Sequence, residues 1–100
     1  MPAASEAGIG REGDALVFTG ALDRAAAAAA WPRAVAQLAG VQRIVLTNVT
    51  AVDSAGLALL AELAARLRAA GGTPRIEGEP PGLADLRAAY RLTPELDFPA

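Results

Sequence analysis

The stretch that decides the fold of this chain is Val52-Asp53-Ser54-Ala55-Gly56-Leu57-Ala58-Leu59-Leu60. From here onward, apolar side chains recur at spacings of three and four residues, at Leu57, Leu60, Ala64 and Leu67, and Leu63 widens the stripe. This periodicity predicts an amphipathic helix that faces a core on one side and ends at the Gly71-Gly72 pair. Glu62 and Arg66 lie four residues apart and are expected to form a surface ion pair.

The segment before this helix is the clearest strand of the chain. Val41–Thr47 contains Ile44-Val45-Leu46, an apolar run typical of a strand that is covered on both faces. We therefore expect this strand at the centre of a sheet. Residues Asn48–Val52 are expected to form the loop that joins it to the helix.

The N-terminal part of the chain predicts a strand followed by a helix. Asp14–Gly20 contains a short apolar run closed by glycine, which favours a strand. Asp23 then precedes a run of alanines, the best helix formers, and is expected to cap a helix that reaches Gly40. Pro32 lies inside this segment, so we expect a kink, or two helical pieces that meet near Trp31.

The remaining segments complete an alternation of strands and helices. Thr73–Gly78 predicts a weak strand, which Pro74 should confine to a sheet edge. Pro80-Pro81 starts a last helix with Leu83, Leu86 and Tyr90 on one stripe, ended by Thr93-Pro94. A further short strand is possible at Ile9–Glu12.

This order of elements predicts an α/β fold with right-handed crossovers and a mostly parallel sheet. The length of 100 residues predicts one domain, with its core at about residues 9–92 and flexible ends at residues 1–7 and 95–100.

Composition excludes several kinds of catalytic site. The chain has no cysteine and no histidine. Disulfides, thiolate nucleophiles, Cys/His zinc sites and histidine-based triads are therefore excluded. Asp23 and Asp53 could be imagined as a catalytic carboxylate pair, but no base or metal-ligand spacing accompanies them. We expect no catalytic residue, no metal and no cofactor, and a small enzyme is the weakest of the functional hypotheses.

Charge and hydropathy limit the partners and the location. The formal net charge is −2, and the nine basic residues are all arginines scattered along the chain, which argues against a nucleic-acid partner. The N-terminus lacks the pattern of a secretory signal, and the longest nearly uncharged stretch, residues 25–32, is too short to span a bilayer. A soluble, cytoplasmic protein without direct membrane insertion is expected.

Two interpretations of the helix start remain open. The first is structural: Asp53 or Ser54 caps the helix, and Gly56 allows close packing. The second is functional: the loop lies at the carboxyl end of a strand, where ligands and partners meet α/β sheets, and free N–H groups favour an anionic group. The residues that would form such a contact are Thr50, Asp53, Ser54, Ala55, Gly56 and Leu57.

Two motifs resemble those of a known family. Val52–Leu60 resembles the Asp-Ser/Thr-x-Gly-Leu signature of STAS domains, and Gly20-Ala21-Leu22-Asp23 resembles their Gly-x-Leu-Asp element. The resemblance spans roughly residues 14–92. Leu46–Leu60 and the closing Ala88–Leu92 are most similar to MlaB-like members, the small STAS subunits of Mla-type phospholipid-transport ABC complexes. The resemblance implies a sheet of four or five strands with helices largely on one side.

The resemblance also implies a function. In the phosphorylation-switched members, the anti-sigma-factor antagonists, the acceptor serine immediately precedes the motif glycine, and this chain has Ala55 there. Ser54 matches the hydroxyl residue of the MlaB-like pattern, for which the resemblance implies contact with the transporter's ATPase subunit. A non-enzymatic subunit of a transporter that maintains outer-membrane lipid asymmetry is therefore expected, peripheral at the inner membrane through its partner. The alternative is an anti-sigma-factor antagonist that binds a kinase-like anti-sigma factor, with Ser54 as a possible phosphorylation site. Self-association stays open.

Overall fold

The computed structural model describes residues 8–97. Its elements alternate as expected and are β1 (Gly8–Glu12), β2 (Ala15–Leu22), α1 (Arg24–Ala36), β3 (Arg43–Val52), α2 (Ser54–Ala69), β4 (Arg75–Glu77) and α3 (Leu83–Ala89). The expected flexible N-terminal segment at 1–7, and the part of the expected flexible C-terminal segment 95–100 that follows residue 97, lie outside the described residues.

The four strands form one mixed sheet in the order β1-β2-β3-β4. β2 pairs with β3 in parallel, and β3 pairs with β4 in parallel. β1 pairs with β2 antiparallel through a tight turn. The mostly parallel sheet is thus confirmed, as are the extra N-terminal strand and the edge position of the weak strand that follows Pro74.

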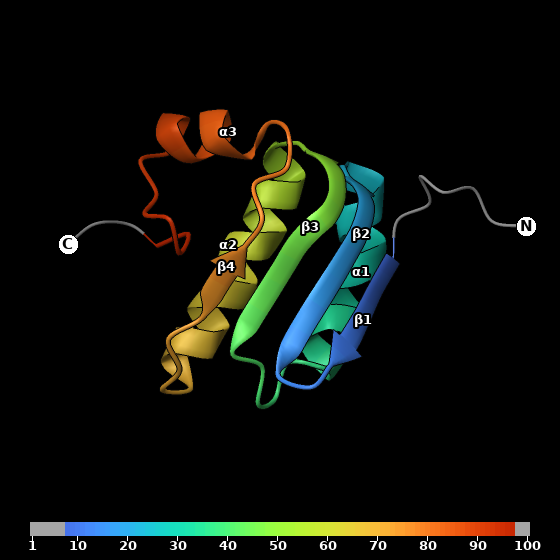
Figure 1. The fold of residues 1–100 in the computed structure, drawn as a ribbon, viewed down its shortest axis with the longest axis vertical. Helices are drawn as coiled ribbons and strands as arrows, with labels where there is room; N and C mark the ends of the chain where they lie inside the picture. Colours follow the sequence, from blue (N-terminus) through green and yellow to red (C-terminus); the bar gives the residue numbers. More distant parts are fainter. Residues whose placement is uncertain (1–7, 98–100) are drawn as a thin grey trace, which may run out of the picture.

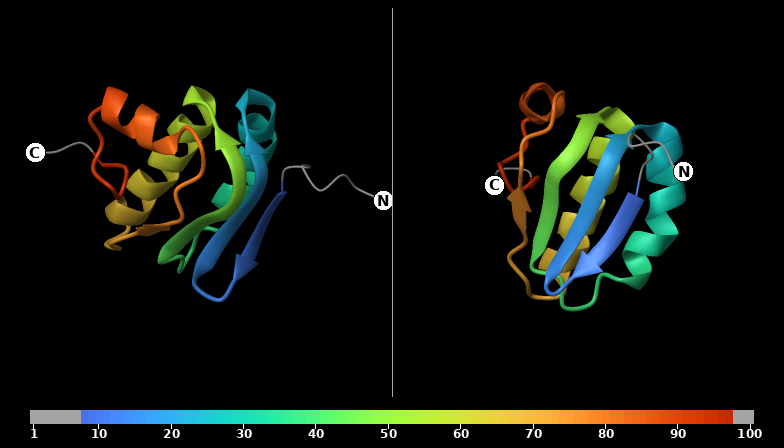
Figure 2. Two further views of the ribbon diagram at one scale, coloured as in Figure 1. Left: turned by 45° about the horizontal axis from the view of Figure 1, so that its top comes forward. Right: turned by 45° about the vertical axis from the view of Figure 1, so that its right-hand side comes forward.

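Two helices cover one face of this sheet. Figure 1 shows α1 and α2 behind the strands, and the turned views of Figure 2 show them on the same side. α3 lies at the end of the sheet where β3 finishes and α2 begins (Figure 1). There the Val52 N–H donates to the Pro81 carbonyl at 3.1 Å. The fully buried core lies between the sheet and the helices and includes Leu16, Phe18, Ile44, Leu46, Leu60 and Leu63.

The expected loop at Asn48–Val52 is wrong, because β3 continues to Val52. Asn48 pairs with Thr19 in β2, and the pairing extends to Val52 opposite Leu22. Val49 and Val52 are buried at 5% and 6% exposure, whereas Asn48, Thr50 and Ala51 are exposed. The polar positions that suggest a loop are therefore the outer face of a long strand.

Two helix expectations also need correction. α1 ends at Ala36 rather than Gly40, and it continues through Pro32 as one helix. Because Ala28 and Pro32 are both exposed, water can satisfy the carbonyl that the proline leaves without a donor. In the last helix, Leu83 is buried but Tyr90 is 51% exposed, so Tyr90 does not continue the apolar stripe into the core.

The core extends beyond the expected boundary at residue 92. Leu96 is buried at 1% exposure. The Arg68 guanidinium reaches the carbonyls of Glu95 and Leu96 at 3.1 and 3.4 Å. Residues 95 and 96 are therefore tied to α2.

Arg43 holds the opposite end of the sheet. Its guanidinium donates to Asp14 at 3.0 Å and to both carboxylate oxygens of Glu77 at 3.1 and 3.2 Å. Hydrogen bonds and charge from Asp14 and Glu77 raise the pKa of Arg43 above its ordinary value. One cation thus links the residue before β2 to β3 and β4.

Gly56 sets the distance between α2 and the sheet. A Cβ built on Gly56 would overlap the carbonyl oxygen of Leu22 at the end of β2. The first turn of α2 therefore packs directly on a backbone group of the neighbouring strand, which any side chain would prevent.

Replacing this glycine should destabilise the protein. We expect Gly56→Ala to lower the free energy of unfolding by about 1–3 kcal/mol, because overpacking outweighs the better helix propensity of alanine. Urea denaturation measures the change. The control is Gly10→Ala, whose added Cβ meets nothing within 4 Å. Equal stability of the two variants would contradict the close packing at Gly56.

Candidate functional site

The carboxyl ends of β2 and β3 start two helices side by side. Leu22 and Val52 are paired in register, and each is followed by an aspartate and a helix. The Asp23 carboxylate accepts the Ala26 N–H at 2.9 Å, and the Asp53 carboxylate accepts the Gly56 N–H at 2.9 Å. The two aspartates are N-caps of α1 and α2, and the structural interpretation of Asp53 is confirmed.

Asp53 also connects the two helices. Its second carboxylate oxygen accepts the N–H of Arg24, the first residue of α1, at 3.2 Å. The Asp53 N–H in turn donates to the Leu22 carbonyl at 3.3 Å. One residue therefore satisfies free donors at the start of both helices and holds their ends together.

This arrangement leaves little for catalysis. Asp23 and Asp53 both hold backbone N–H groups, and no hydrogen bond connects the aspartates to a candidate base in residues 8–97. Within the same residues, no cluster of three or more acidic side chains could hold a metal ion. Both carboxylates at this site thus serve as acceptors for backbone N–H groups.

The six predicted contact residues divide by exposure. Thr50, Asp53 and Ser54 are exposed, and Ala55 is half-buried. Gly56 and Leu57 are buried, so their main contacts are internal. We call the accessible four, Thr50, Asp53, Ser54 and Ala55, the motif surface.

The Ser54 side chain is exposed at the start of α2. Its hydroxyl makes no hydrogen bond within the described part of the chain. Since Asp53 already caps α2, the Ser54 hydroxyl is not needed for that task. It is an exposed donor and acceptor at a helix start.

An apolar hollow adjoins the motif surface and was not expected from the sequence. It has a volume of about 230 Å³ and is lined by Ser54, Leu57, Ala58, Ala61, Tyr90 and Leu92. Ser54 and Leu57 were among the predicted residues, and the other four were missed. The sequence offered one indirect signal for it: Tyr90 and Leu92 belong to the Ala88–Leu92 segment that resembles MlaB-like members.

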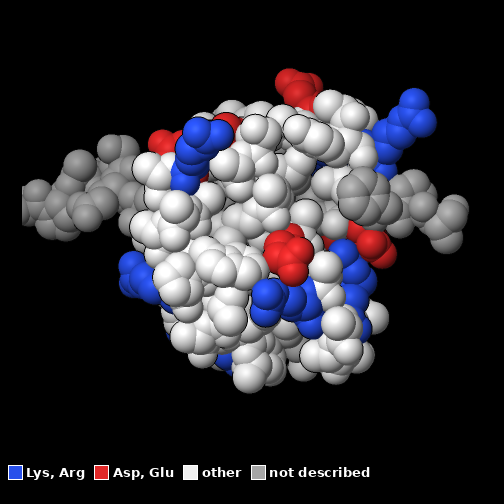
Figure 3. All heavy atoms as spheres, turned by 180° about the vertical axis from the view of Figure 1, so that it is seen from behind, with Lys and Arg blue, Asp and Glu red and all other residues white. Residues whose placement is uncertain are grey.

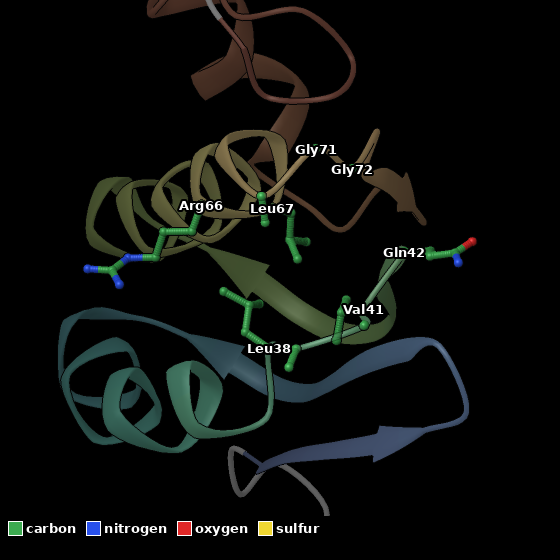
Figure 4. Close-up of a pocket in the computed structure, with 10 residues that line it drawn as sticks. Leu38, Val41, Gln42, Arg66, Leu67, Gly71 and Gly72 are labelled. Atoms are coloured by element: carbon green, nitrogen blue, oxygen red, sulfur yellow. The ribbon is translucent and has the colours of Figure 1, made fainter.

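A second hollow lies at the opposite end of the two covering helices. It measures about 370 Å³ and is bounded by the end of α2 and the segment between α1 and β3. In Figure 4, Leu38, Val41 and Leu67 face its interior, whereas Arg66 and Gln42 point away. Polar groups do not converge there, which makes it a poor candidate for a ligand site.

Charged groups are dispersed on the helix side of the molecule. From the helix side, Figure 3 shows a largely uncharged surface with dispersed acidic and basic groups. The basic residues Arg43, Arg66, Arg68 and Arg87 are each engaged by a carboxylate, and the expected pair of Arg66 with Glu62 is present at 3.3 Å. Arg66 also lies 4.9 Å from the centre of the Trp31 ring. Within residues 8–97, no helix is long and apolar enough to cross a membrane.

The shared cap predicts a ranking of two aspartate variants. We expect Asp53→Ala to destabilise by about 2–3 kcal/mol, because two backbone donors lose their acceptor. Asp23→Ala removes one such bond and should cost about 1 kcal/mol. Chemical denaturation of both variants gives the order. A cost for Asp23→Ala equal to or above that for Asp53→Ala would show that the bond to Arg24 contributes nothing.

Comparisons with known proteins agree with this architecture. The structure is similar to the anti-sigma factor antagonist SpoIIAA in its unphosphorylated form, with a TM-score of 0.65 and 18% sequence identity, over 89% of this chain and 84% of that one. At this identity the likeness concerns the fold. A search of curated proteins found no match. The family model described as the MlaB STAS domain matches residues 6–96. Because that match spans nearly the whole chain, this protein belongs to the MlaB-type STAS domain family.

Proposed function

We propose that this chain is a non-enzymatic subunit that binds and supports the ATPase subunit of an Mla-type phospholipid-transport ABC transporter. The family membership supports the class of partner. The observation that carries the proposal is the exposed Ser54 hydroxyl, which no residue of the described chain engages. It lies on a rigid helix start that Asp53 holds in place, so little ordering would be needed on binding.

The proposed role is regulatory rather than catalytic. Asp23 and Asp53 are occupied as caps, and the chain lacks cysteine and histidine. In this account the subunit supports ATP hydrolysis by its partner, in a transporter that maintains outer-membrane lipid asymmetry. The chain would then be cytoplasmic and peripheral at the inner membrane through the ATPase.

The second candidate is an anti-sigma-factor antagonist, which the fold likeness to SpoIIAA favours. Ala55 weighs against it, because the residue before the motif glycine has no hydroxyl to phosphorylate. Ser54 is exposed and could accept a phosphate instead. A phosphate there would add about −1.5 to −2 charge at a helix N-terminus and would repel an acidic partner.

Binding to the purified ABC ATPase subunit from the same host tests the first candidate. We expect Ser54→Arg to weaken binding by a factor of about ten or more, because a bulky cation replaces a small contact at the interface. The matched control is Ala69→Arg, an exposed position at the far end of the same helix with the same change in charge. The control should bind as the unmodified chain does.

Two outcomes of this titration would contradict the proposal. The unmodified chain could fail to bind the ATPase, which refutes the class of partner. Alternatively, a folded Ser54→Arg could bind as well as Ala69→Arg, which refutes the assigned surface. Isothermal titration calorimetry measures the binding of each chain, and circular dichroism shows whether each variant is folded. Together they distinguish these two outcomes.

Incubation with a kinase-like anti-sigma factor and ATP separates the two candidates. The transporter proposal predicts no stoichiometric phosphate on Ser54 by mass spectrometry. Complete phosphorylation of Ser54 with release of that kinase would instead support the antagonist.

A further inference from the structure

The hollow beside the motif surface has the character of a side-chain socket. Leu57, Ala58, Ala61 and Leu92 present only carbon to it, Tyr90 contributes an exposed wall, and Ser54 lies at the rim. A charged group placed here would lose hydration without gaining a partner, so the hollow favours an apolar occupant. Its volume of about 230 Å³ is below the range of about 300–1,000 Å³ that is usual for small-molecule sites.

The shape of the hollow depends on how α3 ends. The Arg91 N–H donates to the Ala88 carbonyl at 3.2 Å, and the Leu92 N–H donates to the Arg87 carbonyl at 2.9 Å. These two bonds form a Schellman motif, which turns the chain through a left-handed residue. Tyr90 and Leu92 are thereby both brought to line the hollow over α2.

Arg91 is an unfavourable residue for this turn. Its φ angle is +57°, a conformation in which glycine is favoured and other residues are strained. Within residues 8–97, the Arg91 guanidinium forms no hydrogen bond or ion pair that would offset the strain. Arg91 thus combines a left-handed backbone conformation with an exposed charge that no described residue pairs, next in sequence to two residues that line the hollow.

We propose that this hollow receives one large apolar side chain of the ATPase subunit, and that Arg91 pairs with an acidic residue beside that side chain. The inference rests on the proposed function and adds the chemistry of the contact to it. The unpaired positive charge of Arg91, adjacent in sequence to two lining residues, selects an acidic neighbour, and the apolar lining selects leucine, methionine or phenylalanine as the anchor.

Filling the hollow tests the apolar anchor. We expect Ala58→Phe to weaken binding of the purified ATPase by about tenfold or more, as the loss of an interface anchor does. Ala69→Phe makes the same change at an exposed position on the same helix, outside the hollow, and should bind normally. Equal binding of the two folded variants would overturn the proposal.

Arg91→Gly tests the charge and separates binding from folding. Glycine relieves the strain at positive φ, so the thermal midpoint should stay the same or rise. Binding should still weaken by about threefold to tenfold, with slower association and a smaller dependence on salt. Arg33→Gln, on another exposed helix end, is the control because it also removes one positive charge, and it should bind as the unmodified chain does. Unchanged binding of Arg91→Gly would refute the role of Arg91.

The outcomes distinguish this inference from the proposed function. If the unmodified chain does not bind the ATPase, the proposed function fails. If it binds and binding is weakened by Ser54→Arg but not by Ala58→Phe, only the proposed apolar contact in the hollow is refuted. If the unmodified chain dimerises in sedimentation and Ala58→Phe abolishes the dimer without affecting the ATPase, a second copy occupies the hollow and the proposal is overturned.

Discussion

The Asp53 carboxylate is the interaction on which the rest of the structure depends. It accepts one N–H from α2 and one from α1, which starts 29 residues earlier in the chain. Next to it, Gly56 lets α2 rest on the carbonyl of Leu22. These contacts hold the helix starts against the ends of two parallel strands, where ligands and partners of α/β sheets meet the protein. A flexible loop at this point would place the same side chains without fixed geometry.

Asp53 and Ser54 have different roles at the start of α2, and this difference connects the fixed helix start to the proposed function. Because Asp53 provides the cap, the neighbouring hydroxyl of Ser54 is left exposed and has no hydrogen-bonding partner among residues 8–97. A rigid helix start, a free hydroxyl and an adjoining apolar hollow together provide the usual parts of a binding surface: an orienting polar group and a pocket for an anchor. Ala55, in the place of the acceptor serine, makes the proposed transporter subunit a better account than a phosphorylation switch.

Local patterns predicted the parts of this fold that depend on neighbouring residues. These parts include the apolar stripe of Leu57, Leu60 and Leu67, the aspartate caps, and the edge strand after Pro74. The motif residues also indicated the family. Features that join distant segments could not be predicted from local patterns. The strand at Asn48–Val52 exists because it pairs with β2, and its polar residues alone suggested a loop. The bond from Arg24 to Asp53 and the hollow under Tyr90 depend on tertiary packing, which no short pattern encodes.

The central claim is that the surface around Ser54 binds an ABC ATPase, and site-specific photo-crosslinking in the native host tests it most directly. A photoreactive phenylalanine derivative in place of Tyr90, a 51% exposed aromatic residue that lines the hollow, should crosslink to the ATPase subunit, with peptides identified by mass spectrometry. The same residue at Arg33, on the exposed end of α1, should not. Crosslinking of position 90 to a kinase-like anti-sigma factor, or of the ATPase to position 33 alone, would contradict the account.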